Sequence, residues 1–297
     1  MKKVQLVICL ILSFTMMHLA ASAQQHMENT MSQYFRNRML WNPGFTGADG
    51  NKIFALQNHS WVGFEGAPVL TNISGEVNFE QNSALGLQFM SDVIGVLYRT
   101  FGVLNYAYKV KLTQDQIIRI GISLSFSGDR LNSKYIDQGG VLDPLIVSSI
   151  DNKIKFDGNI GAVYINKKLT LGFSAYKLSE NFRLNKGGNA NLAFAQLGGS
   201  YDINIEGVEK LNLKPLAMVR LYRNTSALVD LGAQVQYNKK VNLMAVYQSS
   251  GNVRAGAGMS ISNFGDANFF YNTNVKVANT SSQQYEIGIG LYLKGKK

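Results

Sequence analysis

From residue 52 to the C-terminus, hydrophobic and polar residues alternate over one segment after another. Within residues 118–127, for example, the alternating positions are apolar at Ile118, Ile120, Ile122, Leu124 and Phe126, and polar or small at Arg119, Gly121, Ser123, Ser125 and Ser127. A period of two places the apolar side chains on one face of a β-strand. Positions three and four apart mix apolar with polar residues, and glycine recurs inside the segments, so the pattern argues against helices.

The pattern predicts about 14 strands, most of them roughly 8–13 residues long, which is the length that a tilted strand needs to cross a membrane. We expect them at residues 52–61, 69–79, 84–91, 97–110, 116–127, 155–165, 169–176, 191–203, 211–223, 227–238, 241–248, 252–261, 267–276 and 285–294. Strands of soluble globular proteins average about 5–6 residues. The lengths and the even count predict an all-β fold, a transmembrane antiparallel β-barrel over residues 51–297.

The alternative fold is a soluble β-sandwich or a pair of them, because sandwich strands also alternate. Water covers the polar face of a sandwich strand, so that face is rich in Lys, Glu and Thr. In this chain the polar positions are mostly Gly, Ser, Asn and Gln, which suits the lumen of a barrel. Aromatic residues near the expected strand ends suit the girdles at membrane interfaces, namely Trp61, Tyr98, Tyr106, Tyr108, Tyr164, Tyr176, Tyr201, Tyr237, Tyr247, Phe269 and Tyr271.

The lengths of the connections predict the orientation of the barrel. An even strand count places both termini on one side, and bacterial barrels have short periplasmic turns and long outer loops. The longest connections, residues 128–154 and 177–190, follow odd-numbered strands, whereas the tight turns 166–168 and 239–240 follow even-numbered ones. We therefore expect the long loops outside and the termini in the periplasm, although the connection 204–210 is longer than an inner turn usually is.

The first residues predict export. Lys2 and Lys3 precede the apolar stretch 4–19, and Ala21-Ser22-Ala23 forms an A-x-A cleavage site, so residues 1–23 are expected to be a signal peptide. A transmembrane anchor is the less favoured alternative, because the apolar run is short and ends in small residues. After the signal no apolar run reaches the roughly 20 residues of a membrane helix. A chain that spans the membrane must then do so as a barrel, which places it in the outer membrane of a Gram-negative cell.

Residues 24–50 follow a different pattern. Met31, Tyr34, Phe35, Arg38 and Trp41 lack the period of two and suit one face of a short helix. Asn42-Pro43-Gly44 then predicts a turn. We expect an N-terminal arm that plugs the barrel or docks on its periplasmic rim, with Tyr34, Phe35, Trp41, Asn42 and Pro43 as its candidate docking residues.

Charge and composition limit the chemistry. The formal charge of +10 becomes about +8 after removal of Lys2 and Lys3. No basic cluster with interleaved aromatic residues accompanies this excess, so nucleic acid is not an expected partner, and outer-membrane lipid or an acidic protein fits better. The only cysteine, Cys9, lies in the signal peptide. We expect no cofactor.

Catalytic and metal sites are not expected either. After the signal peptide the only histidines are His26 and His59, which do not form a metal-ligand cluster. Asn58-His59-Ser60 raises a barrel hydrolase as a remote alternative. Neighbouring strand residues point to opposite faces, however, so His59 and Ser60 are poorly placed to form a triad.

The connection between the first two expected strands, residues 61–68, is the most unusual segment. It carries two aromatic residues, an acid and a proline. Either the aromatic side chains fold into the barrel mouth and brace it, or they meet a partner. The candidate partner-binding residues are Trp61, Phe64, Glu65 and Pro68.

Several motifs resemble the PorP/SprF family of outer-membrane proteins, which is associated with the type IX secretion system. The matching residues are Ser32-Gln33-Tyr34-Phe35, Asn42-Pro43-Gly44-Phe45-Thr46-Gly47, Trp61 to Pro68, Gly86-Leu87-Gln88-Phe89 with Asp92 and Gly95, Tyr106-Ala107-Tyr108 and Asp143-Pro144. Two features depart from the family. Gly44-Phe45-Thr46 replaces the commoner Ala-Tyr-x, and the C-terminus ends in Lys297 rather than an aromatic residue.

The resemblance implies a non-enzymatic barrel that works with other type IX components. Family members assist the secretion or surface tethering of cargo proteins, often large adhesins with a type B C-terminal sorting domain, and some act with the gliding motor. The alternative function is a passive porin or a channel for hydrophobic solutes.

Overall fold

The computed structural model describes residues 28–79, 81–131, 154–179, 194–205, 210–222, 226–261, 264–276 and 283–293. The predicted signal peptide, most of the two long connections and Asp143-Pro144 lie outside these residues. The strands are β1 (Lys52–Ser60), β2 (Val69–Asn78), β3 (Ser83–Ile94), β4 (Leu97–Lys111), β5 (Ile117–Leu131), β6 (Lys155–Ile165), β7 (Leu169–Tyr176), β8 (Phe194–Tyr201), β9 (Ile203–Asn204), β10 (Leu211–Tyr222), β11 (Leu228–Tyr237), β12 (Val241–Gln248), β13 (Asn252–Ile261), β14 (Gly265–Asn274) and β15 (Gln284–Tyr292).

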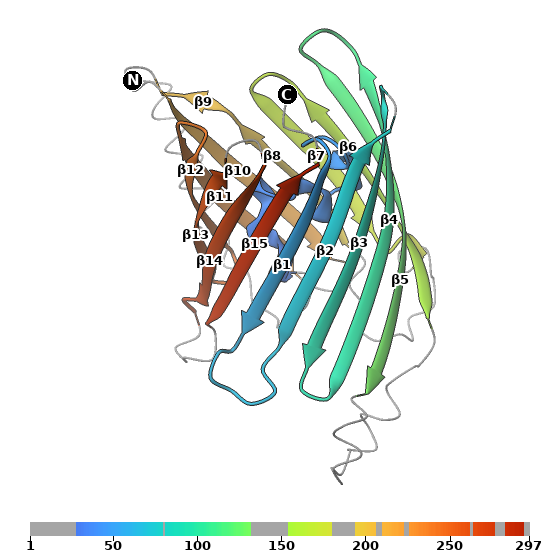
Figure 1. The fold of residues 1–297 in the computed structure, drawn as a ribbon, viewed down its shortest axis with the longest axis vertical. Coiled ribbons are helices and arrows are strands. Elements are labelled where there is room, and N and C mark those ends of the chain that lie inside the picture. The colour runs from blue at the N-terminus through green and yellow to red at the C-terminus, as the bar shows by residue number, and fades with distance from the viewer. Residues whose placement is uncertain are drawn as a thin grey trace.

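The strands form one closed antiparallel barrel (Figure 1). Strands next to each other in the sequence pair with each other, β15 pairs with β1, and β10 pairs with β11. β9 is a two-residue continuation of β8 after Asp202, and both pair with β10. With β8 and β9 counted as one strand of the wall, the barrel has 14 strands, as the sequence predicts.

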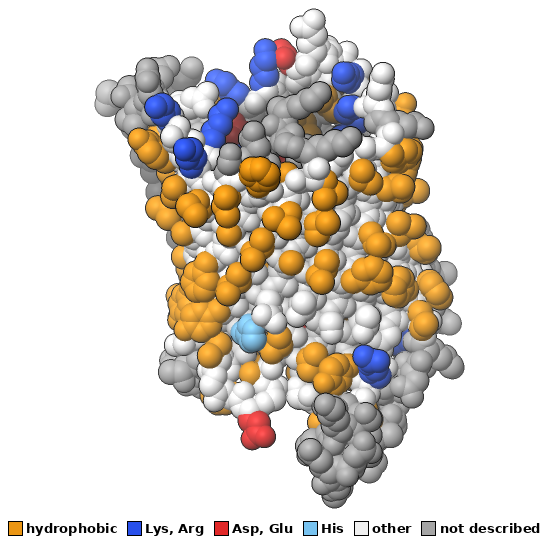
Figure 2. Space-filling view, in the orientation of Figure 1, with side chains coloured by type: hydrophobic (Ala, Val, Ile, Leu, Met, Phe, Trp, Pro, Cys, Tyr) orange, Lys and Arg blue, Asp and Glu red, His pale blue; other side chains and the backbone are white. Residues whose placement is uncertain are grey.

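The barrel has mostly apolar side chains outside and many polar side chains inside, beside an inward-facing apolar cluster that includes Phe54, Leu56 and Leu70. On β5, Ile120, Ile122 and Leu124 are more than half exposed, whereas Arg119 on the other face is buried. Buried polar residues occur on strands all around the wall, among them Asn58, Asn72, Asn105, Asn159, Gln196, Asp230, Arg254 and Glu286. Figure 2 shows the hydrophobic band on the outer surface. A soluble sandwich would have the opposite polarity, so that alternative is wrong.

The chain enters and leaves the barrel at the same end, because Lys52 at the start of β1 pairs with Tyr292 at the end of β15. The turns at residues 166–168 and 238–240 lie at this end, and the loop after β1 lies at the opposite end (Figure 1). The chain also leaves β5 and β7 at the opposite end. This is the relation between long and short connections that the sequence predicts. Within the described residues, no helix is long and apolar enough to span a membrane.

Most of the expected girdle residues face outward. Tyr106, Tyr108, Tyr201, Tyr237, Tyr247 and Phe269 are exposed on the outer surface. Phe269 and Tyr271 flank Tyr285, with ring centroids 6.1 and 5.4 Å from it. Tyr176 is the exception, because it is 7% exposed and has the phase of the inward-facing residues of β7. Its assignment to a girdle was wrong, since an aromatic residue at a strand end does not by itself reveal which face it occupies.

The orientation can be tested with protease on intact cells. We expect the first cuts within residues 128–154 or 177–190, because these connections lie at the end opposite the termini and are predicted to be outside. Mass spectrometry of the released peptides would locate the cuts. Cutting at Lys167-Lys168 or Lys239-Lys240 in cells with an intact outer membrane would show the reverse orientation.

Candidate functional site

The N-terminal arm, residues 28–50, contains three short 3-10 helices: η1 (Glu28–Phe35), η2 (Arg38–Leu40) and η3 (Pro43–Phe45). The predicted single helix is therefore interrupted. Pro43 lacks a backbone N–H and begins η3, and the side chain of Asn42 accepts a hydrogen bond from the Gly44 N–H at 2.8 Å. The predicted turn at Asn42-Pro43-Gly44 is confirmed, with Thr46 N–H donating to the Pro43 carbonyl at 3.1 Å.

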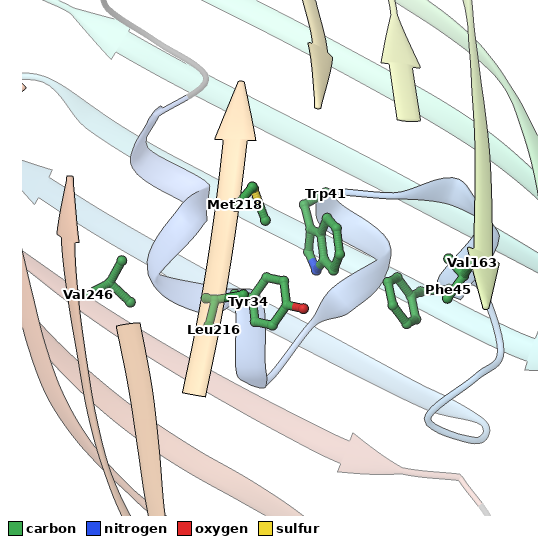
Figure 3. Packing of buried hydrophobic residues seen from close by; sticks show 7 residues of the cluster. All are labelled: Tyr34, Trp41, Phe45, Val163, Leu216, Met218 and Val246. Carbon is green, nitrogen blue, oxygen red and sulfur yellow. The ribbon is translucent and has the colours of Figure 1, made fainter. Parts of the chain in front are cut away.

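An aromatic cluster lies at the centre of the arm (Figure 3). Tyr34 stacks on Trp41 with centroids 4.5 Å apart, and Trp41 contacts Phe45 at 4.9 Å. All three are at most 2% exposed. They pack with Val163 on β6, Leu216 and Met218 on β10, and Val246 on β12. Burial in this apolar cluster raises the pKa of Tyr34 to about 12, because it disfavours the charged phenolate.

The turn at Asn42-Pro43-Gly44 is bonded to β5, β6 and β7. The Asn42 Nδ2 group donates to the carbonyls of Phe173 at 2.9 Å and Ala162 at 3.3 Å. Arg119 Nε donates to the Gly44 carbonyl at 3.0 Å, and its Nη2 donates to Thr46 O. The turn is therefore held by both its side chain and its backbone.

Three glycines of the wall make room for this turn, and we call them the glycine notch: Gly121 on β5, Gly161 on β6 and Gly172 on β7. A Cβ on Gly121 would lie 2.3 Å from the Pro43 carbonyl carbon, and one on Gly161 would lie 2.1 Å from Asn42 Oδ1. Gly121 and Gly161 are opposite each other in the strand register. Glycine inside a strand often marks a bend or the close approach of another backbone. Here they allow close approach of a second backbone.

Buried carboxylates of the wall hold both ends of the arm. Ser32 Oγ and Gln33 Nε2 both donate to Glu286 on β15, which also accepts from Asn58 Nδ2 at 3.3 Å. Near the other end, Glu76 on β2 accepts from the Gly47 N–H at 2.7 Å. A carboxylate buried without such donors would be strongly destabilising.

Two ion pairs stabilise the C-terminal end of the arm, near Gly47. Lys52 Nζ lies 3.3 Å from Glu76 Oε1 and donates to the Arg36 carbonyl at 2.8 Å. Arg38 Nε donates to Asp49 Oδ2 at 3.1 Å, and its guanidinium lies 4.4 Å from the Phe45 ring centroid. The arm thus folds on itself as well as on the wall.

The arm is bonded to much of the barrel's circumference. Asn37 Nδ2 donates to Ser74 on β2 at 2.8 Å. The Trp41 carbonyl accepts from Ser174 on β7 at 3.2 Å and from Gln196 on β8. Sequence reasoning found the arm but missed its wall partners Glu76, Arg119 and Glu286. The available signal was a charged residue in the inward phase of a strand that crosses a membrane.

The loop at residues 61–68 lies at the opposite end and does not fold into the lumen. Trp61 is 39% exposed and Phe64 is 55% exposed, so the inward-packing alternative is wrong. Glu65 is also exposed, whereas Pro68 is buried at the loop's exit. Pro68 can therefore stiffen the loop but offers little surface for contact.

Backbone hydrogen bonds hold this loop in one shape. Trp61 has φ +52°, and its N–H donates to the Gln283 carbonyl at 2.9 Å. The Phe64 N–H donates to Trp61 O, and the Ala67 N–H donates to Phe64 O, both at 3.2 Å. Gly95 N–H, from the β3–β4 turn, donates to Gly66 O at 2.9 Å. The two exposed rings are thus presented on an ordered turn.

The glycine notch can be tested with a matched pair of variants. Gly121→Ala should weaken docking of the arm by about 1–3 kcal/mol, because the new methyl overlaps the Pro43 backbone. Trypsin should then cut after Arg36 or Arg38 in the purified protein, while the folded barrel keeps its heat-modifiable gel mobility. Gly128→Ala on the same strand is the control, since a Cβ there meets nothing within 4 Å. Equal protection of the arm in both variants would contradict the role of the notch.

Comparisons with known proteins agree with this architecture. The sequence model of the family "Type IX secretion system membrane protein PorP/SprF" matches residues 22–291. Among solved structures, the Acinetobacter baumannii outer membrane protein Omp33 is similar in fold, with TM-score 0.51 and 7% identity over 82% of this chain and 97% of that chain. The Ralstonia pickettii toluene transporter TbuX gives TM-score 0.50 and 11% identity over 85% of this chain and 91% of that chain. A search of curated protein sequences gives no significant match.

The two structural similarities concern the fold alone, because the identities are low. They agree with an integral β-barrel of the outer membrane. The family match covers nearly the whole described chain, including the arm, the loop at residues 61–68 and every strand except the last residue of β15. The chain belongs to the PorP/SprF family of type IX secretion system membrane proteins.

Proposed function

We propose that this chain is a non-enzymatic, plugged barrel that assists the secretion or surface tethering of a type IX cargo protein, such as a large adhesin with a type B C-terminal sorting domain. The observation that carries the proposal is the arm, which is bonded across the lumen, combined with an ordered aromatic loop at the far end. A barrel built in this way suits a platform that holds a partner better than a conduit.

The packing of the arm supports a closed lumen. Tyr34, Trp41 and Phe45 bring apolar volume into the lumen and are almost fully buried. Truncation of buried aromatic residues typically destabilises a protein by about 3–5 kcal/mol, so this cluster is expected to keep the arm in place. A passive porin needs an open aqueous lumen instead.

The polarity of the wall argues against a channel for hydrophobic solutes. The inward faces of β10, β11 and β13 carry the buried charges Arg220, Asp230 and Arg254, with Arg220 Nη2 and Asp230 Oδ2 2.6 Å apart. An apolar solute on this path would have to displace the hydration or the partners of such groups without replacing their hydrogen bonds. The similarity of fold to the toluene transporter TbuX is therefore no reason to propose toluene transport for this chain.

The loop at residues 61–68 supports contact with a partner. Trp and Phe side chains that fill a pocket on a partner dominate the binding energy of many interfaces. Trp61 and Phe64 are exposed while their backbone is already ordered, so little conformational entropy remains to be lost on binding. Glu65 adds one negative charge beside them for a basic group on the cargo.

The closed lumen predicts a low conductance. The intact protein in a planar bilayer should show little steady current, and deletion of residues 28–46 should raise it severalfold if the barrel still folds. Heat-modifiable gel mobility of the deletion variant is the control for folding. A high and steady conductance of the intact protein would favour the porin instead.

The loop predicts a loss of cargo without a loss of barrel. The double change Trp61→Ala and Phe64→Ala should weaken binding of the cargo's sorting domain by about 2 kcal/mol or more, which is about 30-fold in Kd. Cells should then release the cargo into the medium while barrel abundance and heat resistance stay normal.

Phe264→Ala is the matched control for this experiment, because Phe264 is 75% exposed at the opposite end of the barrel. It should leave cargo retention unchanged. A parallel fall of barrel abundance and cargo in the double variant would indicate a structural role for the loop. Normal retention with a normal barrel would remove the loop from the proposal.

A further inference from the structure

The end of the barrel where the chain enters and leaves carries five exposed lysines on neighbouring turns, which we call the lysine arc: Lys167, Lys168, Lys210, Lys239 and Lys240. They belong to the connections β6–β7, β9–β10 and β11–β12. Figure 2 shows Lys and Arg side chains gathered at this end, beyond the hydrophobic band. Hydrogen bonds join the turns to the adjacent strand ends, since Asp202 N–H donates to the Lys168 carbonyl and Asn238 N–H to the Lys210 carbonyl, both at 2.7 Å.

Two outward-facing tyrosines lie directly beside the arc. Tyr201 ends β8 and pairs in register with Leu169, the residue after Lys168. Tyr237 ends β11 and pairs with Leu211, the residue after Lys210. Both rings are exposed on the outer surface. Tyrosine at a membrane interface sits at headgroup depth, and a lysine one position farther out reaches the phosphates with its flexible stem in the apolar layer.

Two lysines of the arc lie in tight turns with an unusual backbone conformation. Lys210 has φ +77° and Lys239 has φ +55°, which is the left-handed region that glycine and asparagine adopt more easily. Asn238, with φ +50°, is a residue type that often adopts this region, whereas Lys239 is not.

Nearby acids do little to neutralise the arc within the described residues. Lys167 Nζ lies 2.7 Å from Asp115 Oδ2. Both side chains are well exposed, so this ion pair adds little to stability. Asp202 pairs with Lys214 at 3.1 Å. The segment 206–209, which includes Glu206 and Glu209, lies outside the described residues. Among the described residues, no acid forms an ion pair with the other four lysines.

We propose that the lysine arc is a binding site for anionic glycerophospholipids, with the lysines contacting the lipid phosphates and Tyr201 and Tyr237 lying along the glycerol regions. With the termini in the periplasm, the bound lipid belongs to the inner leaflet of the outer membrane. Lipid phosphates lie at the depth where the apolar band of the barrel ends, and lysines at a membrane surface are attracted to anionic lipid. This site is independent of the cargo and of the loop at residues 61–68.

The test compares lipid binding by two purified variants with equal changes of charge. The first carries Lys168→Gln, Lys210→Gln, Lys239→Gln and Lys240→Gln. The control carries Arg130→Gln, Lys155→Gln, Lys177→Gln and Lys276→Gln at the opposite end of the barrel. Each protein is titrated in mixed micelles with dioleoylphosphatidylglycerol or dioleoylphosphatidylcholine, and retained lipids are counted by native mass spectrometry. Heat-modifiable gel mobility reports whether each barrel is folded.

We expect the intact protein and the control to retain phosphatidylglycerol in preference to phosphatidylcholine, and the lysine variant to bind phosphatidylglycerol at least about tenfold more weakly. Equal retention of the two lipids by the intact protein would overturn the proposal, as would equal losses in the two folded variants. Unchanged lipid binding together with a loss of secretion in cells would also overturn it and would assign the arc to an acidic protein partner. If the four-lysine variant does not fold, Lys239→Gln with Lys240→Gln provides the same comparison against Lys155→Gln with Lys276→Gln.

Discussion

The rest of this structure depends on the closure of one hydrogen-bonded sheet. In a bilayer no water satisfies the backbone N–H and C=O groups of an open strand edge, so a strand protein can cross only as a closed barrel. The pairing of β15 with β1 and of β10 with β11 removes those edges. Closure also fixes the direction of every side chain. Each strand has one face toward lipid and one toward the lumen, so the residues that face lipid must be mostly apolar.

The polar and charged side chains that line the interior then need hydrogen-bond partners. The arm supplies many of these, because its hydroxyl, amide and backbone N–H groups donate to Glu286 and Glu76, while its carbonyls accept from Arg119. In return the wall gives the arm the notch at Gly121, Gly161 and Gly172. The two parts stabilise each other, because an unpartnered charge in this interior would be costly. The arm is therefore held inside the barrel by complementary contacts and is not a loosely attached tail.

The two ends of the barrel are surfaces that can act on the surroundings, and they differ chemically. One end presents the exposed rings of Trp61 and Phe64 with Glu65 on an ordered turn. The other presents lysines beside the rings of Tyr201 and Tyr237. Aromatic rings suit a pocket on a protein, whereas lysines next to a tyrosine girdle suit lipid phosphates. This asymmetry fits the membrane-anchored platform that we propose.

The sequence by itself determined the strands, their number and the presence of the arm. An alternation of period two is a local property, and the turn at Asn42-Pro43-Gly44 follows from the backbone limits of Pro and Gly. Only the tertiary structure decided which groups meet. Glu286 and Ser32 are 254 positions apart, and the contact of Gly121 with Pro43 spans two parts of the chain that no local pattern relates. Likewise, Tyr176 faces inward while Trp61 and Phe64 face outward. The physical reason is that such contacts form only when the closed wall brings distant strands around the arm, and many sequences with the same periodicity would place different partners there.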